Sequence, residues 1–302
     1  MSSRSSALPF AAIFLLALIW GYNWVVMKLG VADCSPLLFA ALRILLSAPI
    51  LFGLSLVLRR SLQIPPWHYI VPYALLQSTF FVGGSMLALH YAGAGKTAIL
   101  VYMMPIWLML LAWPFLGERL HGLQKPALLL AILGLLAVLE PWKAAGGSWY
   151  GAFFAIVSGF SWAASAVWHK RFAPPGQDLI NATFWQALIG GLVLIALALG
   201  LEGWQVRWTH LFVLALAYNV IPGTALAYVL WLYALRNLPS GVAGIATLLA
   251  PIIGVIAAWW QLGEQPNHWE TVGMMGIIAA LLLVSWQHLR PKEDSILPQP
   301  QE

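Results

Sequence analysis

The chain contains the same motif twice, at an offset of 146 residues (251 − 105 = 146). The first copy runs from Pro105 to Glu118, and the second runs from Pro251 to Glu264. In each copy a proline, an Ala-Trp pair and a closing Leu-Gly-Glu keep the same spacing. Both copies lie in apolar runs that are long enough to cross a bilayer. Such a duplication of apolar segments is typical of secondary transporters.

The composition places the chain among membrane proteins. Of its 302 residues, 61% are hydrophobic and only 8% are charged, whereas a soluble domain has about 25% charged residues. Apolar runs of roughly 18 to 25 residues recur with short breaks, which predicts an all-α polytopic membrane protein. The predicted spans are 8–27, 36–58, 67–90, 94–115, 124–140, 148–169, 180–201, 209–235, 240–262 and 268–288.

The positive charges predict the orientation. An even number of spans puts both termini on one side, and lysine and arginine favour the cytoplasmic side. The loops on the terminus side hold ten of them, namely Arg4, Arg59, Arg60, Arg119, Lys125, Lys170, Arg171, Arg236, Arg290 and Lys292. The opposite loops hold four, namely Lys28, Lys96, Lys143 and Arg207. Both termini are therefore predicted to be cytoplasmic. Because these charges are dispersed over many loops, they predict no nucleic-acid partner.

The duplication predicts two halves of opposite orientation. Residues 1–145 and 146–290 each hold five spans, followed by a cytoplasmic tail at 291–302. Trp20 corresponds to Trp162 and Lys28 to Lys170, at an offset of 142. An odd number of spans per half inverts the second half, so that two similar gates surround one central site. A pathway within one chain favours a monomer over a channel formed by a ring of subunits.

Further residues carry a family resemblance. The first span reads Ile19-Trp20-Gly21-Tyr22-Asn23-Trp24, and the doubled Pro…Gly-Glu pattern follows in both halves. The chain resembles the EamA-type branch of the drug/metabolite transporter superfamily, and its many aromatic residues resemble those of bacterial aromatic amino acid exporters. This resemblance implies a bacterial inner-membrane protein with ten helices, two inverted five-helix repeats and a central cavity. It also implies that helices 1, 3, 4, 6, 8 and 9 line the cavity.

The two mid-span prolines are candidate hinges. Pro105 and Pro251 each remove a helix hydrogen bond and clash with the carbonyl four residues earlier, so a kink is expected at both. The kinks either bend as the gates close or shape the bundle statically. Gly83 and Gly84 in the third span let helices approach closely and are further candidates for flexibility beside the cavity.

The Gly-Glu pairs that close each copy are predicted to be structural. Gly117 and Gly263 fit the cap position after a helix. Glu118 and Glu264 fall at span ends, where a carboxylate can accept hydrogen bonds from neighbouring backbone. A charge inside the membrane is by default a functional candidate, but these two residues are predicted to lie outside the membrane interior.

Six residues are candidate substrate ligands. Polar side chains inside spans should face the bundle interior, and aromatic walls suit flat amphipathic solutes and ammonium groups. The candidates are Trp20, Asn23, Gln77, Tyr102, Trp162 and Asn219. The alternative for the amides is that they join helices to each other, and for the aromatics that they pack. Arg43 either snorkels to the surface or pairs with a substrate carboxylate.

The absence of certain groups constrains the mechanism. All ten acidic residues fall in loops, tails or span ends, which favours uncoupled transport over proton coupling. His90, near the end of the third span, is the group that keeps the proton-coupled alternative open. A single cysteine, Cys34, excludes an intramolecular disulfide, and no metal or cofactor is predicted.

An enzyme is disfavoured because the chain lacks membrane-protease motifs, and the segment 93–97 lacks the full spacing of a phosphate loop. We therefore expect an exporter of amino-acid-like metabolites, with aromatic or other neutral amino acids favoured. A proton-coupled exporter of drugs or other metabolites is the alternative, and a channel is a more remote one.

Overall fold

The computed structural model describes residues 7–118, 122–140, 149–227, 230, 233 and 240–289. In these ranges the chain is nearly all helical, with one isolated bridge between Cys34 and Val206. The elements of the first half are α1 (Ala7–Asp33), α2 (Pro36–Val57), α3 (Trp67–Ala74), η1 (Leu75–Gly83), α4 (Gly84–Tyr91), α5 (Ala94–Val101), α6 (Met104–Leu116) and α7 (Gln124–Leu139). Those of the second half are α8 (Trp149–Phe172), α9 (Leu179–Leu201), α10 (His210–Val220), η2 (Ile221–Leu226), α12 (Ser240–Leu262) and α13 (His268–Leu289).

Each of the ten predicted ranges coincides with a helical segment where it is described. Of these, six are long and apolar enough in the described residues to cross a membrane. They are Leu8–Asp33, Pro36–Val57, Trp67–Tyr91, Ala94–Leu116, Trp149–Phe172 and Leu179–Leu201. The first helix runs past its predicted end at residue 27, because the apolar run continues through Leu29, Gly30 and Val31.

The two helices that carry the duplicated proline differ. In the first half, Tyr102 and Met103 separate α5 from α6, just before Pro105. In the second half, α12 continues unbroken through Pro251. Proline removes one amide donor and crowds the preceding turn in both places. The same residue thus accompanies an interruption in one helix and an unbroken run in the other.

Two π-helical stretches occupy corresponding positions. The stretch η1 begins at Leu75 and η2 begins at Ile221, at the same 146-residue offset as the proline motif (221 − 75 = 146). Pro222 near the start of η2 has no amide hydrogen to give to the helix ladder. Such π-helical turns often occur at functional sites because they shift side chains out of the regular register.

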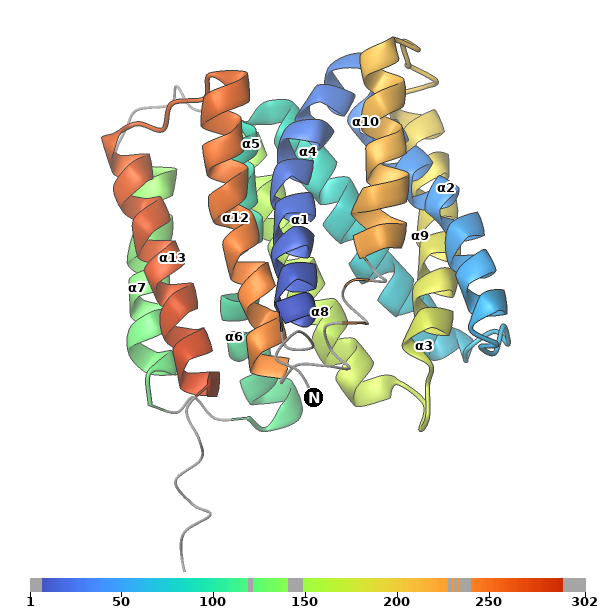
Figure 1. Cartoon of the computed structure of the whole chain (residues 1–302), viewed down its shortest axis with the longest axis horizontal. Coiled ribbons are helices and arrows are strands. Elements are labelled where there is room, and N and C mark those ends of the chain that lie inside the picture. The colour runs from blue at the N-terminus through green and yellow to red at the C-terminus, as the bar shows by residue number, and fades with distance from the viewer. Residues whose placement is uncertain are drawn as a thin grey trace, which may run out of the picture.

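Helices from the two halves pack in pairs. Figure 1 shows α7 beside α13 at one edge and α2 beside α9 near the other, with α1 next to α12 between them. The pair α7–α13 meets at Gly134 and Gly273, where a Cβ on Gly273 would lie 2.5 Å from the carbonyl oxygen of Gly134. Glycine is required there because the two backbones touch.

The bundle has two ends, which we define by α1. The proximal end is where α1 begins, at Ala7, and the distal end is where α1 finishes, at Asp33 (Figure 1). Helix α6 finishes at the proximal end and α12 at the distal end. The two copies of the Gly-Glu motif therefore lie at opposite ends of the bundle.

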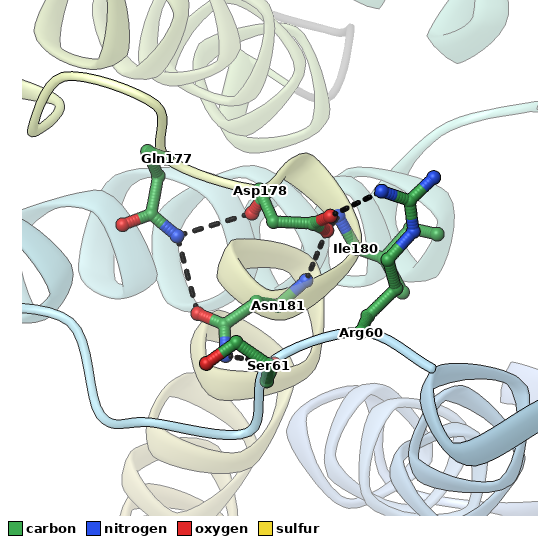
Figure 2. Close-up of polar contacts among 6 residues, drawn as sticks. All are labelled: Arg60, Ser61, Gln177, Asp178, Ile180 and Asn181. Atoms are coloured by element: carbon green, nitrogen blue, oxygen red, sulfur yellow. Dashed lines mark hydrogen bonds and ion pairs between the residues drawn. The ribbon is translucent and has the colours of Figure 1, made fainter. Parts of the chain in front are cut away.

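The proximal connection after α2 is tied to the start of α9. Figure 2 shows Arg60 beside Asp178, with 3.3 Å between the guanidinium and the carboxylate. The Asp178 side chain also caps α9 by accepting from the amides of Ile180 (2.7 Å) and Asn181 (3.1 Å). Asn181 donates its own amide to the carbonyl of Ser61 at 2.7 Å. One carboxylate thus serves both a helix cap and an ion pair.

The distal ends of the same two helices are tied as well. Glu202, which ends α9, accepts from the first amides of α2 at Leu37 (3.0 Å) and Leu38 (3.3 Å). Arg207 lies 2.7 Å from the carboxylate of Asp33. The helices α2 and α9 are therefore joined at both ends of the bundle.

Candidate functional site

The distal end is closed over the turn between α4 and α5. Glu264 follows α12, and its carboxylate accepts hydrogen bonds from the amides of Ala94 (2.8 Å) and Gly95 (3.0 Å) at the start of α5. A helix N-terminus favours a carboxylate because its amides are unpaired and its dipole is positive. From α1, Lys28 donates to the carbonyl of Ala92, before the same turn, at 2.8 Å. One turn is therefore held by a cation and an anion from two other helices.

Gly93 is needed at this turn. A Cβ built on Gly93 would lie 2.7 Å from a carboxylate oxygen of Glu264, so any larger residue would push the carboxylate away. The segment 93–97 is the one whose glycines partly match a phosphate loop. Its amides are already occupied by a carboxylate of the same chain, and Lys96 pairs with Glu270 at 2.8 Å. This arrangement leaves the segment's anion-binding groups engaged within the protein.

The proximal end has the corresponding Gly-Glu pair in a different setting. Gly117 adopts a positive φ of 72° after α6, and Gly263 adopts 68° after α12, so both glycines occupy the left-handed cap conformation. Glu118 contacts Lys170 at the end of α8, and their side chains are 51% and 62% exposed. Lys28 and Lys170, which the repeat relates, thus make contacts at opposite ends of the bundle. Lys28 binds the carbonyl of Ala92 at the distal end, and Lys170 contacts the carboxylate of Glu118 at the proximal end.

Two predicted amide ligands are deeply buried. Asn23 on α1 is 6% exposed, and Asn219 at the end of α10 is fully buried. The Asn219 amide donates to the carbonyl of Ala215 at 2.9 Å. The Oδ1 atoms of both residues are buried and have no hydrogen-bond partner among the described residues. A buried acceptor without a donor is costly, so each oxygen is suited to receive a donor from a bound solute.

The third predicted amide is already bonded within the protein. Gln77 on η1 accepts a hydrogen bond from the hydroxyl of Ser165 on α8. This contact joins two helices of different halves, which is the interhelical alternative for this residue. The side-chain oxygen of Gln77 therefore has a partner, whereas that of Asn219 has none among the described residues.

The predicted aromatic residues lie on the interior faces of helices. Tyr102 is buried at the interruption between α5 and α6 and meets Trp24 edge to face, with 6.1 Å between the ring centroids. Trp20 and Trp162 are partly buried and pack against the main core. Tyr22 meets Tyr218 in a second edge-to-face pair at 6.0 Å. The pairs Tyr22–Tyr218 and Trp24–Tyr102 therefore flank Asn23 in sequence and join α1 to other helices.

Two buried donors on α5 and α6 were not predicted as ligands. The indole nitrogen of Trp107 on α6 and the hydroxyl of Thr97 on α5 are buried without a partner among the described residues. Trp107 follows the interruption at Tyr102 and Met103 by about one turn of helix. The sequence feature that could have pointed to Trp107 is a polar atom next to the mid-span proline Pro105. This feature alone does not distinguish a ligand from a packing residue.

The candidate hinge residues lie at helix contacts. A Cβ on Gly83 would meet Leu194 at 2.9 Å, and one on Gly84 would meet the carbonyl of Phe154 at 3.3 Å. Both glycines therefore allow close packing of this segment against α8 and α9. Pro105 starts α6 and Pro251 lies inside α12, so a hinge role stays a prediction for both.

The charged and titratable candidates have different surroundings. Arg43 on α2 is partly buried and contacts the sulfur of Met27 at 2.6 Å. His90 is exposed at the distal end, where it lines a cavity of about 710 Å³ with Tyr91, Asp33 and Arg207. In the described residues every aspartate and glutamate lies at or beside a helix end; Glu293, Asp294 and Glu302 fall outside them. No metal-binding cluster occurs in the part of the chain that is described.

A half-buried histidine was missed in the sequence. His169 near the end of α8 lies 2.6 Å from the hydroxyl of Tyr69, and Tyr73 packs on the same imidazole ring at 5.4 Å between centroids. The sequence offered no signal for this cluster, because Tyr69 and His169 are 100 residues apart and only the packing of α3 on α8 joins them.

Comparison with known proteins gives a consistent result over nearly the whole chain. The EamA-like transporter family matches residues 8–139 and again residues 149–286. The uncharacterized transporter YoaV of Bacillus subtilis is 29% identical over 93% of this chain and 97% of its own length. The uncharacterized inner membrane transporter YedA of Escherichia coli is 25% identical over 96% and 94%.

A functional description accompanies another relative. A probable amino-acid metabolite efflux pump of Escherichia coli is 26% identical over 89% of this chain and 92% of its own. A solved crystal structure superposes with a TM-score of 0.64 at 18% identity, over 93% of this chain and 97% of that chain, which establishes similarity of fold. Two matches to one family, apolar helices of spanning length and relatives named as transporters lead to one conclusion: the chain belongs to the EamA-like transporter family and is a multi-pass membrane transporter of the drug/metabolite transporter superfamily.

Proposed function

We propose that the protein is a ten-helix carrier that exports small amino-acid-like metabolites, with aromatic or other neutral amino acids favoured. The observation that carries this proposal is the buried pair of amide oxygens, on Asn23 and Asn219, that lack a donor in the described structure. Aromatic pairs lie next to Asn23 on α1. Neutral acceptors among aromatic rings suit the ammonium group and side chain of such a solute. The relative described as a probable amino-acid metabolite efflux pump supports the same class.

Alternating access between two inverted repeats is the proposed mechanism. The placement of Glu118 at the proximal end and Glu264 at the distal end supports this arrangement, because equivalent residues of inverted repeats lie at opposite membrane faces. Each carboxylate meets elements of the other half, so opening one end requires its contacts to break. The six candidate ligands remain the proposed substrate-binding residues, and Pro105 and Pro251 remain the proposed hinges.

We propose that transport is uncoupled from protons. The described carboxylates lie at helix ends, and a proton-coupled carrier commonly places one within its pathway. Catalysis is not proposed, since the amides of the segment 93–97 are occupied by Glu264 and the relatives are named as transporters. The ten-to-four distribution of basic residues supports cytoplasmic termini, and the name of YedA supports the inner membrane. The pathway lies within one chain, so the proposed unit is a monomer.

Uptake into proteoliposomes tests this proposal. Labelled phenylalanine, tryptophan, threonine and a nucleotide sugar would be compared with and without an imposed pH gradient. We expect saturable uptake of amino acids at a rate that the gradient leaves unchanged, and little uptake of the nucleotide sugar. Uptake that occurs only with the gradient would refute uncoupled transport. The absence of any amino acid uptake by a folded protein would refute the substrate class.

A further inference from the structure

The two halves use equivalent positions differently beside the π-helical stretches. The offset of 142 relates Asn23 on α1 to Ser165 on α8 (165 − 23 = 142). The offset of 146, which the starts of η1 and η2 share, relates Gln77 to Gly223 (223 − 77 = 146). Ser165 and Gln77 are in contact, because the Ser165 hydroxyl donates to the side-chain oxygen of Gln77. Their repeat-related counterparts, Asn23 and Gly223, also lie beside each other, but Gly223 has no side chain that could donate to Asn23.

The geometry at Gly223 is specific. A Cβ built on Gly223 would lie 3.7 Å from Oδ1 of Asn23 and 3.2 Å from the carbonyl oxygen of Tyr218. The space that a side chain would fill at this position is bordered by two oxygen acceptors. Oδ1 of Asn23 is buried and has no donor among the described residues, although the repeat-related contact is complete.

The chemistry of this space favours a cation. The two atoms that face it, the amide oxygen of Asn23 and the carbonyl oxygen of Tyr218, accept hydrogen bonds and donate none. An ammonium group has three donors and no acceptor, so it matches such a set. The residues that precede the two acceptors or carry them, Tyr22 and Tyr218, form an edge-to-face ring pair with 6.0 Å between the centroids.

We propose that the ammonium group of the substrate binds beside Gly223 and donates to Oδ1 of Asn23, in the space that a side chain fills at the repeat-related position of Gln77. The inference rests on the proposed function and makes it more specific, because it gives the bundle one amine site where its internal symmetry would allow two. Asn23 and Gly223 then select primary amines over acids that lack the amine.

Binding measurements on the full-length protein in detergent test this inference. The probes are L-phenylalanine, phenethylamine, which lacks the carboxylate, and 3-phenylpropanoate, which lacks the amine. We expect the wild type to bind phenylalanine and phenethylamine, and to bind 3-phenylpropanoate far more weakly. Asn23→Ala removes the acceptor, and Gly223→Ala puts a methyl group into the space. Each should raise the Kd for both amines by about tenfold to hundredfold, as expected for losing a hydrogen bond to a charged group.

Two further variants keep the test decisive. Asn23→Asp keeps the shape and adds a negative charge, so binding of phenethylamine should be retained or tightened. If Asn23 instead bound the carboxylate of the substrate, Asn23→Asp would abolish binding of phenylalanine. Gly276→Ala is the matched control, since its Cβ would lie 3.4 Å from Gly134 at the α7–α13 contact, away from the proposed site. It should bind the probes as the wild type does.

The outcomes separate the inference from the proposed function. Wild-type affinity for phenylalanine in both Asn23→Ala and Gly223→Ala would overturn the inference and leave the proposed function standing. Tight binding of 3-phenylpropanoate with no binding of phenethylamine would also overturn it. Binding of phenethylamine that depends on Asn23, without binding of any amino acid, would support the amine site and refute the amino acid substrate. A folded wild type that binds no amine would overturn both.

Discussion

Glu264 and Glu118 hold the same place in the duplicated motif, yet their surroundings differ. Glu264 accepts from two amides at the start of α5 and lies where Lys28 binds the preceding carbonyl. Glu118 contacts the side chain of Lys170, and both of these side chains are largely exposed. The distal carboxylate is therefore part of a helix cap, whereas the proximal one is part of a surface ion pair.

This difference shows how one motif serves two purposes in the same protein. A carboxylate on a helix N-terminus satisfies amides that otherwise lack partners, and it interacts favourably with the positive end of the helix dipole. An exposed ion pair contributes little because water and ions compete for both partners. Equal sequence thus leads to a firm contact at the distal end and a weak one at the proximal end.

The largest expected effect comes from locking one end. In a Cys34→Ala background, a short bifunctional thiol reagent would join Glu118→Cys to Lys170→Cys at the proximal end, or Glu264→Cys to Ala94→Cys at the distal end. Alternating access requires both ends to open, so either link should reduce phenylalanine uptake by about tenfold or more. The single-cysteine variants treated with the same reagent are the controls. Full uptake after complete linking at either end would contradict alternating access.

Removing each carboxylate should lower the free energy of unfolding by different amounts at the two ends. Glu264→Ala loses two hydrogen bonds to a charged acceptor, so its free energy of unfolding should fall by about 1.5–3 kcal/mol. Glu118→Ala loses an exposed ion pair and should fall by about 0.2–1 kcal/mol. Thermal unfolding in detergent measures both.

A variant of Gly93 provides a check on this reasoning. Gly93→Ala should reproduce most of the loss of Glu264→Ala, because its Cβ would displace the carboxylate. The double variant should lose little more than either single variant, since both remove the same contact. Equal losses in Glu118→Ala and Glu264→Ala would remove the proposed difference between the ends.

The two proline helices offer a second contrast. At the interrupted α5–α6 segment, a Cβ on Gly159 of α8 would lie 2.6 Å from the carbonyl oxygen of Val101, so Gly159→Ala should reduce the free energy of unfolding by about 1–3 kcal/mol. Gly276→Ala is the control, because its nearest contact is 3.4 Å. Unfolding curves that coincide for the two variants would mean that α8 does not pack tightly on the interruption.

The smallest effect concerns the distal connection between α1 and α2. Burial, together with the nearby carboxylate of Glu202, raises the pKa of the Cys34 thiol to about 12. The thiol should stay protonated at neutral pH and react slowly with maleimide, with the rate rising as the pH approaches 12. Because the folded pKa is raised, the stability from burying the neutral thiol is present below the unfolded pKa and is lost as the pH rises toward 12. Intact-mass measurement of the labelled fraction against pH checks this, and rapid labelling at pH 7 would contradict it.

The helical ranges and the duplication were predictable because apolar run length and motif spacing are local properties of the sequence. A kink was expected at both Pro105 and Pro251, and because the two prolines sit in the same motif, the sequence did not distinguish the interrupted helix from the unbroken one. The π-helical stretches and the cap made by Glu264 depend on contacts between distant segments. The same holds for Asn23, which was a candidate ligand from its residue type alone, while its position opposite Gly223 follows only from the packing of α1 on η2.

The most direct test of a carrier with one site and two alternating ends is counterflow. Proteoliposomes would be loaded with unlabelled phenylalanine, and the uptake of labelled phenylalanine would be followed from outside without any pH gradient. A carrier should show faster, transient accumulation of label in loaded vesicles than in empty ones, because each return of the site is made with substrate bound. Uptake that is the same in loaded and empty vesicles and does not saturate would contradict the alternating site and would favour a channel.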